Sequence, residues 1–168
     1  MTTLIVRDER PEDLASVRSV NEKAFGQKDE ADLVDRLRHE HFVLASLVAE
    51  REKQIVGHIL FTRMWIQTPG PPVSAVALAP VAVLPDQQRQ GIGAELIRYG
   101  LNWLHQKGET IVIVLGSPNY YPRFGFSAEK ARHLVSPFPP EAFMALELKT
   151  GALDGMAGRV KYPDSFGI

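Results

Sequence analysis

Two almost wholly apolar stretches, separated by one amphipathic pattern, constrain the fold of this chain most strongly. Ser74–Leu84 (SAVALAPVAVL) and Thr110–Leu115 (TIVIVL) are typical of strands buried on both faces. Between them, Gln90–Gln106 places apolar residues three and four positions apart, which predicts a helix with one buried face. A strand, a helix and a strand in this order form a right-handed βαβ unit by default.

The remaining segments predict further strands and helices around this unit. Period-two runs of β-branched and apolar residues predict strands, and three- and four-residue spacing predicts helices. The expected strands are Leu4–Arg7, Phe42–Glu50, Gln54–Ile66, Gly125–Ser127 and Ala142–Lys149, and the expected helices are Pro11–Ala24 and Asp29–Glu40. The Gly-rich tail, Thr150–Ile168, has room for one small strand at Arg159–Tyr162.

Pro80 lies in the middle of the first apolar stretch, where a central strand should not accept proline, because proline cannot donate to a strand ladder. Two interpretations are open. Either the stretch forms two short segments, or it is one strand whose pairing is interrupted at a bulge.

Length and composition limit the function classes. The chain has 168 residues, a formal net charge of -1 and no cysteine. We expect a single domain over residues 1–168. The lack of cysteine excludes a disulfide scaffold, a zinc–thiolate site and a cysteine nucleophile, and we expect no metal site. Near-neutral charge argues against non-specific nucleic-acid binding. The apolar runs are too short to span a membrane and the start lacks a secretory signal, so we expect a cytoplasmic protein without nucleic-acid or membrane partners.

The turn between the first apolar strand and the helix is suited to binding phosphate. Gly91 and Gly93 open the helix, whose first N–H groups lack intrahelical partners and attract anions, and Arg89 adds a positive charge. The dinucleotide pattern G-x-G-x-x-G fails because position 96 is leucine, and the nucleoside-triphosphate loop fails because no lysine follows Gly93. What remains is the pattern Q-x-x-G-x-G at residues 88–93.

A second motif follows about thirty residues later, in the segment Tyr121–Phe126, which has the pattern Y-x-x-x-G-F. Together, in this order and with a buried strand between them, the two motifs resemble those of the GNAT superfamily of N-acetyltransferases, and the resemblance extends over residues 3–149. The fragment GSPNYYPRFGF and the tail GRVKYPDSF resemble one bacterial branch of predicted N-acetyltransferases. The implied fold is a mixed α/β (α+β) one, with a mostly antiparallel central sheet flanked by helices and with splayed fourth and fifth strands.

The resemblance also implies a reaction and its residues. The expected reaction is transfer of an acetyl group from acetyl-CoA to a primary amine, by direct attack in a ternary complex. The backbones of Val81 and Val83 would hold the pantetheine arm, Tyr121 would protonate the leaving thiolate, and Asn119 and Arg123 are candidate cofactor contacts. The residues expected to cradle the pyrophosphate are Gln88, Arg89, Gln90, Gly91, Ile92, Gly93 and Ala94.

Several points stay open at this stage. Many relatives carry a glutamate base on the fourth strand, which has no acid here, so Glu50, His58 and Glu147 are candidate bases, each with a purely structural alternative. Tyr120 competes with Tyr121 for the role of the acid. There are two alternatives to an acetyl-CoA-dependent N-acetyltransferase. One is a non-catalytic acyl-CoA-binding module, and the other is an acyltransferase that uses a different acyl donor. The acceptor could be a small-molecule amine or a protein or peptide amine, and relatives often form homodimers.

Overall fold

The longest strands within residues 3–168 are β3 (Gln54–Gln67) and β4 (Val73–Val83). In the computed structural model, which describes residues 3–168, the chain divides into two compact units. The first unit holds the chain up to Phe61 and Ala79–Gly100, and the second holds Thr62–Leu78 and the chain from Leu101 onward. Each unit therefore contains part of β3 and part of β4.

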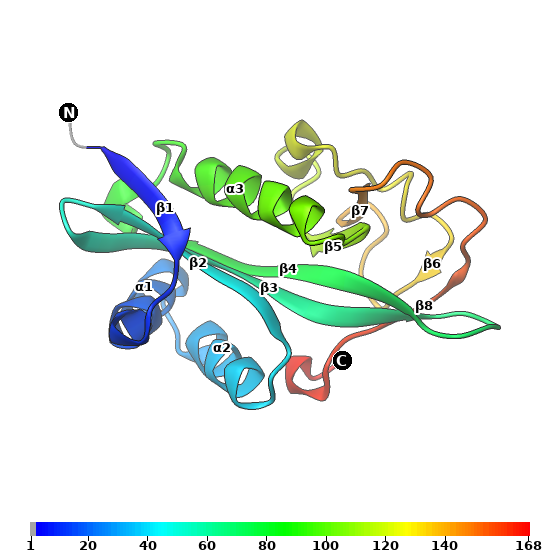
Figure 1. Cartoon of the computed structure of the whole chain (residues 1–168), viewed down its shortest axis with the longest axis horizontal. Helices are drawn as coiled ribbons and strands as arrows, with labels where there is room; N and C mark the ends of the chain where they lie inside the picture. Colours follow the sequence, from blue (N-terminus) through cyan, green and yellow to red (C-terminus); the bar gives the residue numbers. More distant parts are fainter. Residues whose placement is uncertain (1–2) are drawn as a thin grey trace. The chain divides into compact units, whose positions relative to one another are not determined.

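The first unit is a sheet with helices on both faces. Its strands lie in the order β1-β2-β3-β4, and β1 pairs antiparallel with β2. Helices α1 and α2 lie on one face of β2 and β3, and α3 begins on the other face (Figure 1). The bounds are β1 (Leu4–Asp8), α1 (Leu14–Phe25), α2 (Asp29–His39), β2 (Val43–Arg51), the short 3-10 helix η2 (Pro85–Gln87) and the start of α3 (Ile92–Gln106), with the 3-10 turn η1 (Pro11–Asp13) before α1.

Gly57 and His58, two consecutive residues of β3, show which helix packs on which face of this sheet. Successive side chains of a strand point to opposite faces. His58 contacts Asn21 of α1, whereas a Cβ built on Gly57 would lie 3.0 Å from Ile92 Cγ2 and 3.1 Å from Leu96 Cδ1 in α3. The absence of a side chain at Gly57 therefore lets the first turns of α3 pack closely against the sheet.

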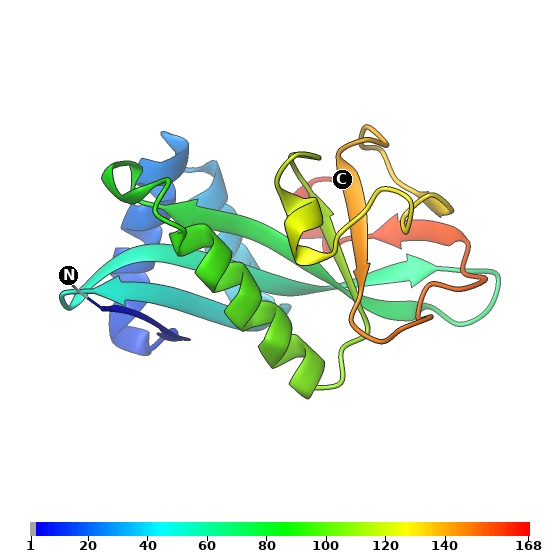
Figure 2. The same cartoon turned by 90° about the horizontal axis from the view of Figure 1, so that it is seen from above.

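The second unit is built around β5 (Ile111–Leu115). Here the strand order is β3-β4-β5-β7, with β8 paired to β3 and β6 paired to β8. The parallel register between β4 and β5 includes Val76↔Val112, and β5 pairs antiparallel with β7 over five residue pairs. Figure 2 shows β7, in orange, alongside β5. The remaining elements are η3 (Tyr121–Phe124), β6 (Leu134–Val135), β7 (Phe143–Glu147), β8 (Gly158–Lys161) and η4 (Asp164–Phe166).

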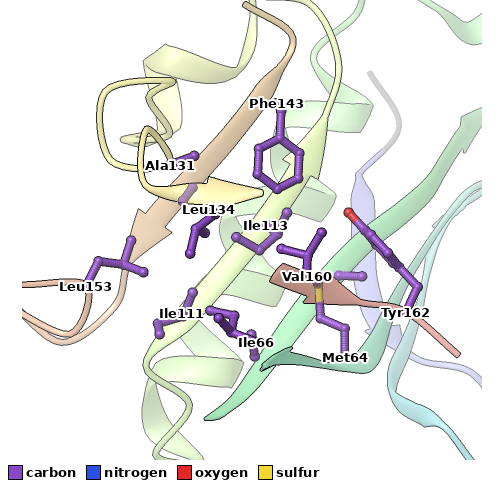
Figure 3. Packing of buried hydrophobic residues seen from close by; sticks show 13 residues of the cluster. Met64, Ile66, Ile111, Ile113, Ala131, Leu134, Phe143, Leu153, Val160 and Tyr162 are labelled. Atoms are coloured by element: carbon purple, nitrogen blue, oxygen red, sulfur yellow. The ribbon is translucent and has the colours of Figure 1, made fainter. Parts of the chain in front are cut away.

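One face of the sheet in the second unit carries an apolar core. Ile111 and Ile113 of β5 contribute alternate residues to it, as expected for one face of a strand. Phe143 of β7, Met64 of β3 and Val160 of β8 pack into the same cluster (Figure 3). The tail thus completes the core through β8, which confirms the small strand expected near its middle.

Most predicted elements are present, and the structure decides or corrects three details of the prediction. The strand through Pro80 is continuous, so the interpretation as two segments is wrong, and the Ala79–Pro80 peptide is cis. Gly125–Ser127 is not a strand, because Gly125 ends η3 with a φ of 100° and Ser127 makes an isolated bridge to Ala145. Helix α3 begins at Ile92, two residues later than predicted, since Gln90 and Gly91 belong to the preceding loop.

No helix within residues 3–168 combines the length and the apolar character needed to cross a membrane. The described part of the chain also contains no group of three or more histidine, cysteine, aspartate or glutamate side chains that could hold a metal ion.

Candidate cofactor and catalytic site

The loop between β4 and α3 has a backbone that turns twice through the left-handed region. Arg89 has a φ of 63° and Gly91 has a φ of 81°, while Gln88 between β4 and these turns is extended. Glycine adopts the conformation of Gly91 without the steric cost that a Cβ would bring. Helix α3 follows, and the N–H of Glu95 donates to Gly91 O at 3.0 Å. The N–H groups ahead of Glu95 lie in the first turn, where a helix offers no acceptor.

The side chains of this loop divide into two kinds. Gln88, Arg89, Gln90 and Gly91 are exposed, so this stretch is open to a ligand. Ile92, in contrast, is only 1% exposed, and its side chain packs toward β3. Ile92 can therefore contribute to a ligand site only through its backbone, as Gly93 and Ala94 would from the half-buried positions that follow.

Val81 and Val83 lie at half-buried positions near the end of β4, on either side of the buried Ala82. Gln88 Nε2 donates to Val83 O at 3.1 Å. This contact ties the loop back to the strand from which it leaves.

In the second unit, Tyr121 begins η3 and its ring lies against Gly116, just after β5. The ring makes an edge contact with Phe126, with centroids 5.9 Å apart. Burial raises the pKa of Tyr121 to about 12, because the apolar surroundings disfavour the phenolate. The phenol therefore keeps its proton throughout the physiological range and can act as a proton or hydrogen-bond donor.

Tyr120 and Arg123 form a pair of their own. The guanidinium of Arg123 lies 4.6 Å from the centroid of the Tyr120 ring, and Arg123 Nε donates to Tyr120 O at 2.9 Å. The rings of Tyr120 and Tyr121 are nearly perpendicular, at 86°. Asn119 is exposed in the preceding turn, where its N–H donates to Ser117 Oγ at 3.2 Å. Arg123 is thus folded onto Tyr120, and any cofactor contact by Arg123 starts from that position.

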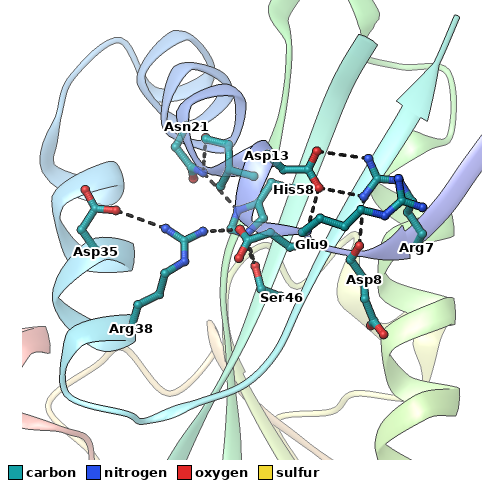
Figure 4. A network of polar contacts seen from close by, with 11 residues as sticks. Arg7, Asp8, Glu9, Asp13, Asn21, Asp35, Arg38, Ser46 and His58 are labelled. Carbon is teal, nitrogen blue, oxygen red and sulfur yellow. Dashed lines mark hydrogen bonds and ion pairs between the residues drawn. The ribbon is translucent and has the colours of Figure 1, made fainter. Parts of the chain in front are cut away.

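His58, one of the candidate bases, is fully buried in a polar network (Figure 4). Asn21 Nδ2 lies 3.0 Å from His58 Nδ1, and Ser46 Oγ lies 2.8 Å from His58 Nε2. Because the amide nitrogen can only donate, Nδ1 accepts, the ring proton sits on Nε2, and Nε2 donates to Ser46. Ser46 Oγ in turn donates to Glu9 Oε1 at 3.1 Å, and Glu9 forms an ion pair with Arg38.

This environment makes His58 a structural residue. Burial, together with the positive charge of Arg38, lowers the pKa of His58 to about 3. Both ring nitrogens are occupied by protein partners. A base needs access to the proton that it removes, and His58 has none.

The two carboxylate candidates also have partners. Arg7 Nη2 donates to Glu50 Oε1 at 3.2 Å. Glu147 accepts from Lys130 Nζ at 2.7 Å and from the N–H of Leu153 at 2.7 Å. The Lys130 contact and this backbone hydrogen bond hold the pKa of Glu147 below its usual range. A carboxylate stabilised in this way is a weaker base than a free one.

The structure also shows one residue that the motifs did not indicate. Arg51, at the end of β2, contacts the loop before α3 through Gln87 and Gln90. Arg51 precedes Gln87 by 36 residues and Gln90 by 39 residues in the sequence, so no local sequence pattern connects it to them.

Comparison with known proteins supports the motifs. The family model for an acetyltransferase (GNAT) domain matches residues 6–128. The chain is 32% identical over 166 residues to the uncharacterised N-acetyltransferase YhbS of Escherichia coli K12, and the match covers 97% of this chain and 98% of YhbS.

Two crystal structures of similar proteins hold the expected cofactor. The E. coli YhbS structure, in complex with CoA, matches this chain with a TM-score of 0.91 at 30% identity. The match covers 100% of this chain and 94% of the YhbS chain. A GNAT family acetyltransferase from Brucella melitensis, in complex with acetyl-CoA, has a TM-score of 0.82 at 36% identity, with 98% of each chain covered.

Proposed function

The chain belongs to the GNAT family of acetyltransferases, and from this premise we propose that it transfers an acetyl group from acetyl-CoA to a primary amine by direct attack. The observation that carries the proposal is the loop before α3, with left-handed Arg89 and Gly91 at a helix N-terminus. Such a terminus presents unpaired N–H groups and a partial positive charge to a phosphate group. The CoA and acetyl-CoA held by the two similar crystal structures support this choice of ligand.

In this proposal the first unit binds the cofactor. The pyrophosphate lies against the loop and the first turn of α3, and the exposed Arg89 adds a charged donor. The pantetheine arm runs along the backbone of Val81 and Val83. A backbone N–H near Val83 would polarise the thioester carbonyl, as a donor aimed at developing negative charge does. The proposed pyrophosphate-binding residues are Gln88, Arg89, Gln90, Gly91, Ile92, Gly93 and Ala94, and Asn119 and Arg123 are proposed as further cofactor contacts.

The proposed reaction needs no covalent enzyme intermediate. The amine nitrogen attacks the thioester carbon, a C–N bond forms, and the C–S bond breaks. The nitrogen loses one proton to water, and the sulfur gains one from Tyr121, which recovers a proton from water before the next turnover. A thiol has an ordinary pKa of about 8.5, well below the pKa of Tyr121, so full proton transfer requires the apolar surroundings to raise the pKa of the thiol as well. Before the proton is transferred, Tyr121 stabilises the leaving sulfur as a hydrogen-bond donor.

The base is water in this proposal. Glu50 and Glu147 are held by cations and His58 is enclosed, so each lacks what a base needs. The amine then reacts as the fraction that is already neutral. The rate of transfer is therefore expected to rise with pH until the pH exceeds the pKa of the amine, and then to reach a plateau. The plateau lies at pH values below the pKa of Tyr121, which is about 12.

Calorimetric titration with acetyl-CoA tests the cofactor step, with Gly91→Glu as the matched variant. Glutamate at this position places a negative charge and a Cβ at a φ of 81°, so binding is expected to be lost. Equal binding by both proteins would contradict the role of the loop. Binding without turnover over a broad panel of amines would instead favour an acyl-CoA-binding module, and turnover with other acyl thioesters would favour a different donor.

A further inference from the structure

Arg51 contacts two glutamines ahead of α3, Gln87 at the end of η2 and Gln90 in the exposed loop. Its Nη1 atom donates to Gln87 Oε1 at 3.0 Å and to Gln90 Oε1 at 2.8 Å. We propose that Arg51 is a positioning residue for the cofactor and holds residues 88–91 in the shape that receives the pyrophosphate. The inference rests on the proposed function, because it assigns a task to Arg51 only if this loop binds CoA.

The loop needs an external constraint because its backbone is unfavourable on its own. Arg89 has a φ of 63° although it carries a side chain, and such a conformation costs about 1–3 kcal/mol and persists only where its surroundings impose it. The loop side chains are exposed, so packing around them is sparse. Gln88 anchors one point to Val83 O, and Arg51 anchors the residues on both sides of Gln88 and Arg89.

The guanidinium group suits this task. One Nη atom carries two hydrogens in a fixed plane, and here each hydrogen has its own glutamine oxygen. A lysine ammonium would keep the charge but not this planar fork. The positive charge also lies beside a loop that is expected to receive a doubly charged group.

The first experiment measures the dissociation constant of CoA by calorimetry for the wild type, Arg51→Met and Lys53→Met. Lys53 is an exposed cation in the same hairpin, so it controls for the loss of one positive charge. We expect Arg51→Met to weaken CoA binding about tenfold, which equals about 1.4 kcal/mol, and Lys53→Met to leave it within twofold. If wild type and Arg51→Met bind equally, the inference is wrong and the proposed function stands. If the wild type itself does not bind, the proposed function fails.

A second set of variants separates positioning from charge. Gln87→Ala removes one acceptor of Arg51 and keeps Arg51, and Gln87 is not itself among the proposed pyrophosphate contacts. If Arg51 acts through its glutamine contacts, Gln87→Ala weakens CoA binding in the same direction as Arg51→Met, and adding Gln87→Ala to Arg51→Met weakens it no further. Additive losses, or full recovery by Arg51→Lys, would show that the charge acts directly on the ligand and would overturn the positioning role. Because Gln87→Ala leaves Arg51 in place, this set also decides the matter if Arg51→Met fails to fold.

Discussion

The ring of Tyr121 occupies the space that a side chain on Gly116 would need. A Cβ built on Gly116 would overlap Tyr121 Cε2 and lie 2.8 Å from Tyr121 Cδ2. Real Cβ atoms are not found at such distances, so a larger residue at this position requires the ring to move. The glycine that follows β5 and the tyrosine that begins η3 therefore form one structural unit.

Replacing Gly116 with alanine is expected to displace the phenol and to lower the rate of acetyl transfer. The cost of overpacking at such a site is typically about 1–3 kcal/mol, and unfolding temperature should fall accordingly. CoA binding should change little, because the loop before α3 is untouched. The measurements are thermal unfolding, CoA titration and transfer to an amine found by screening.

Gly70→Ala is the control for this substitution. The nearest atom to a Cβ built on Gly70 is Thr68 Oγ1, at 3.8 Å, so alanine fits there without displacement. A Gly116→Ala protein with wild-type stability and activity would show that the ring has room elsewhere.

Tyr121→Phe tests the proposed proton donor directly. Loss of a positioned acid lowers rates by about 10²–10⁴, so turnover at saturating acetyl-CoA should fall by at least tenfold while CoA affinity stays unchanged. Tyr120→Phe is the matched variant and is expected to retain most activity, since the Arg123 contacts with Tyr120 use its ring face and carbonyl. If the Tyr120 variant loses activity and the Tyr121 variant does not, the assignment passes to Tyr120.

His58 makes the stability of the fold depend on pH. Its pKa of about 3 in the folded protein lies below the ordinary value of 6.5, so the unfolded chain binds the extra proton first as pH falls. The stabilisation is complete above about pH 6.5 and is lost progressively down to about pH 3, at up to about 1.4 kcal/mol per pH unit. Protonation would place a donor at Nδ1 against the amide of Asn21.

Chemical denaturation at several pH values measures this effect. His58→Gln should lower stability at pH 7 and flatten its dependence on pH between 6 and 4. His105→Gln changes an exposed histidine on α3 and should leave the curve as it is. In the wild-type protein, a His58 imidazole whose NMR signals titrate near pH 6.5 would contradict the buried, neutral state.

Gly100 of α3 tests which of two opposing effects is larger, the gain in helix propensity from alanine or the loss of packing against Phe61. Alanine is the better helix former by about 1 kcal/mol, yet a Cβ on Gly100 would overlap Phe61 Cε2 and lie 2.5 Å from Phe61 Cζ. We expect Gly100→Ala to destabilise the protein by about 1–3 kcal/mol, because Phe61 is fully buried and cannot yield easily. Asn102→Ala, at an exposed position of the same helix, should raise stability slightly. A stabilised Gly100→Ala variant would refute the packing argument.

The elements that sequence predicts well are those with a strong local signal. Helix α3 follows from its apolar periodicity, and strand β5 follows from a wholly apolar run that a tertiary structure must bury on both faces. The ends of elements were less predictable. The position of Gly125 in the left-handed region, for example, closes η3 rather than starting a strand, and this depends on the turn before it.

The sequence by itself determined the family, the loop that would receive a phosphate and the tyrosine motif, because each lies within a few consecutive residues whose spacing has a local physical meaning. Only the tertiary structure decided that Arg51 reaches Gln87 and Gln90, that Arg123 stacks on Tyr120, and that His58 is enclosed by Asn21 and Ser46. Most of these partners lie far apart in the chain. Their contacts exist because strands and helices bring them together, and the same burial sets the pKa values that decide which groups can do chemistry.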